Sequence, residues 1–198
     1  MMGGLGKKQG IGQLLVLSLL IFFLAGTGFA QEETQSISPM TGISLNLGYT
    51  YDPSVDIWFS QATFIKVYDY DQIWPHNAPE ALRFKIEGSL GGFRLDNGDI
   101  RLNAGAAVLA LYYLNRLETD SIKPYVEAGV GIIYTDYQIS GQDYRFNFNP
   151  QAGLGMEIKR ENAEPWFFGI RFHHISNGGI GSVNRGQNSV VFLVGQYF

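Results

Sequence analysis

The chain has 198 residues, of which 14 are lysine or arginine, 18 are aspartate or glutamate, and none is cysteine. The lack of cysteine excludes a disulfide framework and a thiolate metal site. The small acidic excess gives no electrostatic reason to expect a nucleic-acid partner.

Residues 1–30 have the pattern of a targeting segment. Two lysines near the start are followed by an apolar run over 14–24 and then by small residues before a polar stretch. The apolar run is shorter than the roughly 20 residues that a comfortable membrane span needs. We interpret 1–30 as a signal peptide cleaved after Ala30, with an uncleaved anchor helix as the alternative. A single domain, 31–198, then remains, with 12 basic and 18 acidic residues.

In the rest of the chain, apolar residues recur at every second position over stretches of about ten residues. In 43–51, for example, isoleucine, leucine and tyrosine alternate with serine, asparagine, glycine and threonine. This period indicates strands with one apolar face, and ten residues is the length that a tilted strand needs to cross a bilayer. Two stretches are less regular but are also interpreted as strands: 57–68 alternates poorly, and 189–198 is apolar on both faces for part of its length. The expected strands cover 41–51, 57–68, 81–91, 100–114, 122–135, 143–158, 165–176 and 188–198.

Eight antiparallel strands can close on themselves, which removes the sheet edges and pairs every backbone group inside lipid. An exported chain with 25 glycines and 25 tyrosines plus phenylalanines fits such a barrel. We therefore predict an all-β fold: a closed, eight-stranded, antiparallel transmembrane β-barrel of the outer-membrane type. Side chains are expected to fill its interior.

Parity and position assign further residues of the predicted barrel. Charged residues of both signs, expected inside as an ion-pair network, are Arg83, Lys85, Glu87, Glu127, Arg145, Glu157 and Arg171. Aromatic residues near strand ends, expected at the membrane interfaces, are Trp58, Trp74, Tyr112, Tyr134 and Trp166. The long segment 69–79 implies either a longer second strand or a local elaboration. The terminal Tyr197 and Phe198 are typical of strands that outer-membrane assembly machinery binds.

The seventh predicted strand carries His174 and Ser176 near its end. Side chains two residues apart in a strand project on the same face, and a histidine beside a serine hydroxyl is the minimum for a base-activated nucleophile. His173 has the opposite parity and is expected to be structural. The face of His174 also carries an apolar row typical of a surface turned toward lipid: Trp166, Phe168, Ile170 and Phe172.

Both ends of an even-stranded barrel lie on the same side of the membrane, normally the periplasm, so the seventh strand runs outward. This direction places His174 and Ser176 at the outer leaflet, which in a Gram-negative outer membrane is lipopolysaccharide. The predicted substrate is therefore an acyl ester of the lipid anchor. The alternative is a histidine and a serine that place their polar tips at the rim of a barrel.

The segment 172–180, Phe-His-His-Ile-Ser-Asn-Gly-Gly-Ile, followed by Asn-Arg-Gly at 184–186, resembles the signature of the lipid A 3-O-deacylase (PagL-type) family. The resemblance implies an eight-stranded barrel in the bacterial outer membrane that hydrolyses the ester at position 3 of lipid A on its lipid-facing wall. It implies neither a cofactor nor a metal. Carried over to this chain, the resemblance makes Ser176 the nucleophile and His174 the general base. Groups matching the oxyanion donors are Asn177, the backbone N–H of Gly179, and Asn184.

One position departs from this pattern. Well-studied members carry a glutamate twelve residues after the serine, and here that position is Asn188. An asparagine carbonyl can accept a hydrogen bond from the imidazole and fix its tautomer, but it brings no charge to stabilise imidazolium. Residues 165–198 contain no acidic residue, so a carboxylate would have to come from another strand. Reduced activity and lost activity are both consistent with this change.

Two other functions stay open at this stage. A non-enzymatic or degenerate barrel with a structural or adhesive role is favoured slightly by Asn188, whereas the intact His-Ser-Asn-Gly set argues against it. The second open function is a different reaction on lipid acyl chains, either phospholipid hydrolysis or acyl transfer. The expected partners are lipid A or lipopolysaccharide, membrane lipids and the outer-membrane assembly machinery, with a homodimer left open and no nucleic acid.

Overall fold

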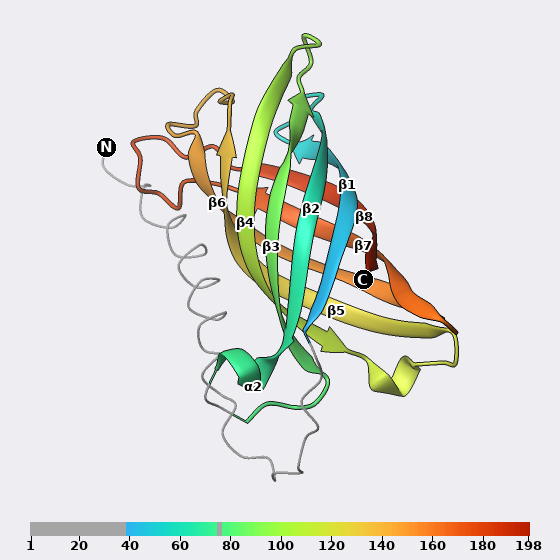
Figure 1. Ribbon diagram of the computed structural model, residues 1–198. Helices are drawn as coiled ribbons and strands as arrows, with labels where there is room; N and C mark the ends of the chain where they lie inside the picture. Colours follow the sequence, from blue (N-terminus) through green and yellow to red (C-terminus); the bar gives the residue numbers. More distant parts are fainter. Residues whose placement is uncertain (1–38, 75–76) are drawn as a thin grey trace.

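The computed structural model describes residues 39–74 and 77–198, and within them eight antiparallel strands form a closed barrel (Figure 1). Each strand pairs with the next, and the last pairs with the first. The strands are β1 (Met40–Asp52), β2 (Trp58–Asp69), β3 (Leu82–Arg94), β4 (Ile100–Tyr113), β5 (Ile122–Thr135), β6 (Phe146–Arg160), β7 (Ala163–Ile175) and β8 (Gln187–Tyr197). The predicted fold class is confirmed, and each strand end lies within three residues of its predicted position.

Two short helices lie in the connections. Helix α2 (Tyr70–Ile73) directly follows β2, so the long 69–79 connection is a local elaboration rather than a longer strand (Figure 1). The 3₁₀ helix η1 (Asn115–Leu117) joins β4 to β5. Among the described residues, no helix has the length and hydrophobicity that a membrane span requires. The predicted signal peptide, 1–30, lies outside the described part of the chain.

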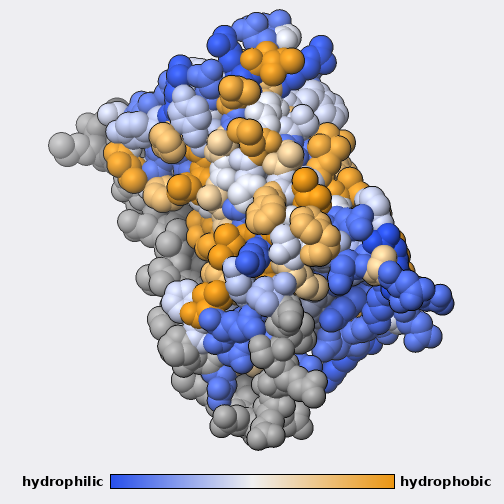
Figure 2. All heavy atoms as spheres, viewed as in Figure 1, coloured by the Kyte–Doolittle hydropathy of each residue, from blue (hydrophilic) through white to orange (hydrophobic). Residues whose placement is uncertain are grey.

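The alternation of side chains in the sequence becomes an outside and an inside of the barrel. In β1, Leu45 and Leu47 are exposed on the outer wall, whereas Ser44 and Asn46 are buried in the interior. Figure 2 shows hydrophobic side chains across the middle of the visible face and hydrophilic residues toward both ends. Exposed aromatic residues near the strand ends include Trp58, Tyr112 and Trp166, as expected, whereas Trp74 follows α2 rather than ending a strand.

The interior is polar in its middle and apolar at both ends. One apolar cluster, around Phe59, Phe93 and Ile175, fills the end that carries the β7–β8 loop. Two smaller clusters, around Phe167 and Tyr125, fill the opposite end. A filled interior agrees with the expectation for eight strands, whose barrel is just wide enough for side chains.

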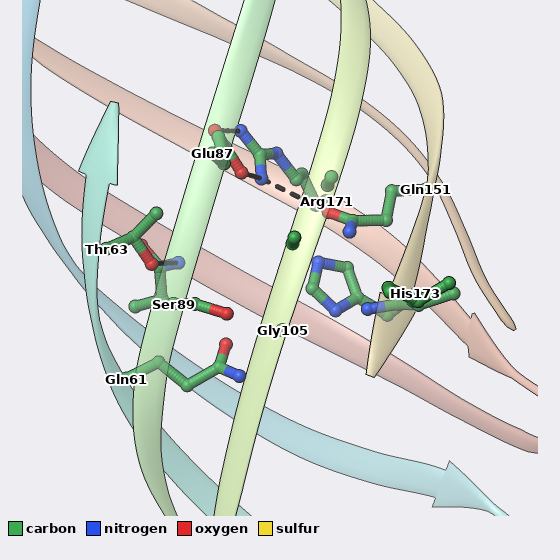
Figure 3. A pocket seen from close by; sticks show the side chains of 13 residues that line it. Gln61, Thr63, Glu87, Ser89, Gly105, Gln151, Arg171 and His173 are labelled. Carbon is green, nitrogen blue, oxygen red and sulfur yellow. Dashed lines mark hydrogen bonds and ion pairs between the residues drawn. The ribbon is translucent and has the colours of Figure 1, made fainter. Parts of the chain in front are cut away.

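Four members of the predicted ion-pair network meet between the apolar clusters: Lys85, Glu87, Glu127 and Arg171. Two others have different partners, since Arg83 pairs with Asp69 at 3.1 Å and Glu157 accepts a hydrogen bond from Tyr113 at 2.7 Å. Arg171 donates to both carboxylate oxygens of Glu87, at 2.7 and 2.6 Å, and also to Glu127. Lys85 forms ion pairs with the same two glutamates, so two cations face two anions in a closed, buried set. Figure 3 shows Arg171 and Glu87 pointing toward each other across this part of the interior.

The prediction for Arg145 is wrong. This residue shares the inward parity of Asn147, but it precedes β6, which begins at Phe146. The residue ladder between β5 and β6 ends at Phe146. Arg145 keeps only one backbone hydrogen bond to the facing strand, in which its carbonyl accepts the N–H of Thr135 at 3.0 Å. Its guanidinium is instead exposed and forms an ion pair with Asp136 at 2.8 Å.

Candidate active site

The last residues of β7 place the predicted catalytic pair on the outer wall. His174 lies between the buried His173 and Ile175, on the parity of the exposed Phe172. Ser176 follows the strand, but its backbone still pairs with Phe148 of β6 through two hydrogen bonds of 3.0 and 2.8 Å. Directly opposed residues share a face of the sheet, and Phe148 is exposed, so Ser176 stays on the outer face with His174. Ser176 is only 8 % exposed.

The imidazole of His174 is held from the neighbouring strand. Asn188 lies directly opposite His174 in the β7–β8 pair, and its Oδ1 is 2.6 Å from Nδ1 of the ring. A Cβ atom at Gly186 would lie 2.6 Å from Cε1 of the same ring, so the loop backbone packs against the imidazole edge and a larger residue would displace the ring. These contacts leave Nε2 as the nitrogen that can serve as the base.

The structure brings His174 and Asn188 together but forms no hydrogen bond between Ser176 Oγ and the imidazole within the residues it describes. The two side chains project from alternate positions of one extended segment, on the same face. Such hydrogen bonds are often long without substrate and tighten in the substrate complex. Ser176 and His174 therefore lie on the same face without a hydrogen bond that joins their side chains.

The loop over 176–186 turns back over the outer wall through two glycines with positive φ, Gly178 (67°) and Gly179 (81°). Asn177 organises this turn: its Oδ1 accepts the Gly179 N–H at 2.9 Å, and its Nδ2 donates to the carbonyl of Val183 at 2.8 Å. Asn184 accepts the backbone N–H of Asn177 through Oδ1 at 2.9 Å. Among the predicted oxyanion donors, Asn177 and Gly179 thus already have partners, whereas Asn184 keeps its amide NH₂ group as a donor.

The same loop is tied to the β5–β6 connection, residues 136–145. The backbone N–H of Val183 donates to Asp143 Oδ2 at 2.8 Å, and that of Arg185 donates to the carbonyl of Gly141 at 2.7 Å. These contacts flank Asn184 on both sides. The position of its amide group is therefore set by two neighbouring connections rather than by one mobile loop.

The sequence interpretation missed one residue beside this site. Asp52 ends β1, and its Oδ2 accepts a hydrogen bond of 2.8 Å from Nδ2 of Asn188. Its Oδ1 forms an ion pair of 2.7 Å with Arg185. A carboxylate from another strand thus lies one side chain away from the imidazole. The absence of acidic residues in 165–198 indicated that a carboxylate would have to come from another strand, but alternation alone did not identify Asp52.

The other described histidine, His173, belongs to the interior. Its ring borders a small polar pocket together with Gln151 and Arg171 (Figure 3), and its Nε2 has no hydrogen-bond partner. The predicted structural role of His173 agrees with this position. Within the described residues, no group of three or more histidines and acidic residues has a geometry that could hold a metal ion.

The fold and the sequence both match known outer-membrane proteins. The chain is 24 % identical over 178 residues to the lipid A deacylase PagL of Pseudomonas aeruginosa, covering 89 % of this chain and 94 % of that protein. The crystal structure of the outer membrane enzyme PagL superposes with a TM-score of 0.59 at 21 % identity, covering 78 % of this chain and 97 % of the other. Neisserial surface protein A gives a TM-score of 0.60 at 14 % identity, with coverages of 83 % and 98 %.

These similarities confirm the predicted fold and its location as a barrel of the bacterial outer membrane. The model of the lipid A 3-O-deacylase (PagL) family matches residues 43–196, which begin within β1 and end within β8. The match confirms the resemblance that the motif in 172–186 carries. On this basis, the chain belongs to the lipid A 3-O-deacylase (PagL) family.

Proposed function

We propose that this protein hydrolyses the ester-linked acyl chain at position 3 of lipid A, with Ser176 as nucleophile and His174 as general base. The observation that carries this proposal is the contact of 2.6 Å between His174 Nδ1 and Asn188 Oδ1. It holds the imidazole on the outer wall, on the same face of the sheet as Ser176.

The chemistry follows from these two side chains. Oγ of Ser176 attacks the ester carbonyl while Nε2 of His174 takes its proton, which is how a neutral hydroxyl becomes a nucleophile. The sugar hydroxyl leaves with that proton, and the acyl chain stays on Ser176 as an ester. Water, deprotonated by the same nitrogen, then attacks the acyl-serine. This second step releases the 3-hydroxy fatty acid and restores the serine.

The tetrahedral intermediate needs a hydrogen-bond donor for its negatively charged oxygen. The amide NH₂ group of Asn184 is suited to this role because its Oδ1 is already used by the backbone of Asn177. Asn177 and Gly179 contribute by shaping the turn. Without a carboxylate at position 188, we expect a lower rate than in members with glutamate there, since imidazolium receives less charge stabilisation.

Mass spectrometry of lipid A tests the proposal. The refolded protein is incubated with lipopolysaccharide in vesicles, beside a His174→Gln variant that lacks the base. We expect the loss of one 3-hydroxyacyl chain and the appearance of the free acid with the wild-type chain only. Unchanged lipid A, a lengthened or added acyl chain, or cleavage of phospholipid alone would each contradict this function.

The change Asn184→Asp isolates the proposed oxyanion donor. The aspartate keeps an oxygen for the N–H of Asn177 but replaces the donating NH₂ with an oxygen that repels the intermediate. Because one such donor is often worth about 10²- to 10³-fold in rate, we expect kcat to fall by that factor with little change in KM. Asn162→Asp, in the exposed β6–β7 turn, is the control. An unchanged kcat in Asn184→Asp would show that donors other than Asn184 stabilise the tetrahedral intermediate.

A second function, a degenerate barrel without hydrolysis, is favoured by two specific observations. The residue that orients His174 is an amide, and Ser176 Oγ makes no hydrogen bond to the ring in the described structure. Hydrolysis by an Asn188→Glu variant alone, with an inactive wild-type chain, would support this second function.

A further inference from the structure

We propose that Asp52 is a positioning residue of this site: its carboxylate fixes the side-chain amide of Asn188, so that His174 carries its proton on Nδ1 and keeps Nε2 free. The inference rests on the function proposed above and adds a residue from the opposite end of the chain. Asp52 acts through Asn188 and does not itself touch the imidazole in any contact described.

The argument starts from which groups can donate. A carboxylate only accepts hydrogen bonds, so the atom of Asn188 that faces Asp52 Oδ2 at 2.8 Å must be the amide nitrogen. The amide oxygen then faces Nδ1 of His174 at 2.6 Å. An amide oxygen also only accepts, so Nδ1 must carry the proton. A neutral imidazole has one ring proton, and Nε2 is therefore left with its lone pair.

Without Asp52, nothing in this set of contacts decides which end of the amide faces the ring. A rotated amide would present its NH₂ group to Nδ1 and would favour the proton on Nε2. That tautomer cannot take a proton from Ser176 at Nε2. A glutamate at position 188 would need no such help, since both of its oxygens accept. Because an amide at position 188 can present either its oxygen or its NH₂ group to the ring, Asp52 is required to fix its orientation.

A β-bulge brings Asp52 to the outer face. In β1, Thr50 pairs with Ser189 in the interior, and simple alternation would then turn Asp52 inward. The register shifts between Thr50 and Asp52, so that Asp52 lies opposite Asn188 instead. Directly opposed residues share a face, and Asn188 faces outward with His174. Re-aiming a side chain beside a site is a common use of such bulges.

Arg185 completes the arrangement from the loop side. Its guanidinium pairs with Asp52 Oδ1 at 2.7 Å, which leaves Oδ2 for Asn188. The backbone of Arg185 is held by Gly141. The carboxylate therefore has a fixed orientation and places a negative charge on the far side of the amide from His174.

The first experiment observes the tautomer directly, by ¹⁵N NMR of histidine-labelled protein in detergent micelles at a pH where the ring is neutral. The chain has three histidines, and a His174→Gln variant assigns the signals. We expect the Nδ1–H tautomer in the wild-type chain and a shift toward Nε2–H in Asp52→Ala. Asp99→Ala is the control: Asp99 pairs with Arg101 at 3.0 Å and is 49 % exposed, against 42 % for Asp52. An unchanged tautomer in Asp52→Ala would overturn the proposal.

The second experiment is a double-mutant cycle with Asn188→Glu, followed by kcat for lipid A. Removing a group that orients a functional histidine typically costs about 10- to 100-fold, and we expect this loss of kcat for Asp52→Ala in the wild-type background. In the Asn188→Glu background the same change should cost nothing or raise kcat, because two adjacent carboxylates repel each other. An equal loss in both backgrounds would indicate a structural role and would overturn the proposal.

The two experiments separate this inference from the function on which it rests. A tautomer shift in Asp52→Ala, together with unchanged lipid A in every background, would reject the deacylase function and support the positioning contact. Hydrolysis by the wild-type chain, with no effect of Asp52→Ala on tautomer or kcat, would support the function and reject the role of Asp52.

Discussion

Replacing Ser176 with alanine should reduce the release of the 3-hydroxy fatty acid by about 10³-fold or more, while the barrel stays folded. The expected loss is large because no acyl-enzyme can form without the hydroxyl. Ser176 is held by backbone hydrogen bonds to Phe148, which alanine keeps. The measurement is release of free acid from lipopolysaccharide, with folding checked by heat-dependent migration on gels.

A serine of the same loop provides the control for this variant. Ser182 is exposed, and Ser182→Ala should leave the rate unchanged. A lipophilic fluorophosphonate should label the wild-type chain at Ser176 and should not label Ser176→Ala, since only a base-activated hydroxyl reacts. Hydrolysis by Ser176→Ala at the wild-type rate would show that the nucleophile lies elsewhere.

Replacing Arg171 with methionine should lower the free energy of unfolding by about 3–5 kcal/mol, the usual cost of removing one partner from a buried ionic set. The guanidinium is nearly inaccessible, and its loss leaves Glu87 and Glu127 to share the single charge of Lys85. Urea unfolding of the protein in detergent micelles, followed by tryptophan fluorescence, measures the change.

Arg101→Met serves as the matched control. Arg101 also forms an ion pair, with Asp99, but its side chain is 44 % exposed at the start of β4. Exposed pairs contribute about 0–1 kcal/mol, so this variant should unfold near the wild-type urea concentration. Equal stability of the Arg171→Met and wild-type proteins would contradict the view that the buried network holds the interior together.

The barrel could be predicted from the sequence because alternation is a strong signal when one face contacts lipid. The same parity that exposes Leu45 and Phe172 also placed Lys85 and Arg171 in the interior. Eight such stretches leave few alternatives, since an open sheet in lipid would leave backbone groups unpaired. The fold and the family followed from these patterns and from the motif in 172–186.

The details that escaped the sequence are those where pairing stops or changes register. In the sequence, Arg145 has the parity of the inward-facing residues, but β6 begins one residue later, at Phe146. Asp52 was missed because the shift after Thr50 inverts the face of the following side chain. Neither event has a sequence signature that alternation alone can reveal. The roles of Ser176, His174 and Asn188 stay predictions that the experiments above test.

The pairing of β1 with β8 makes the two ends of the domain neighbours, because Asp52 lies in the first strand and Asn188 in the last. These residues are far apart in the sequence, and they come together only when β1 pairs with β8 and the barrel closes. A chain in which β1 and β8 have not paired would have His174 beside Asn188, but the carboxylate of Asp52 would not lie next to Asn188. Under the proposed role of Asp52, full hydrolytic activity would require the pairing of β1 with β8, so that hydrolysis would report a closed barrel.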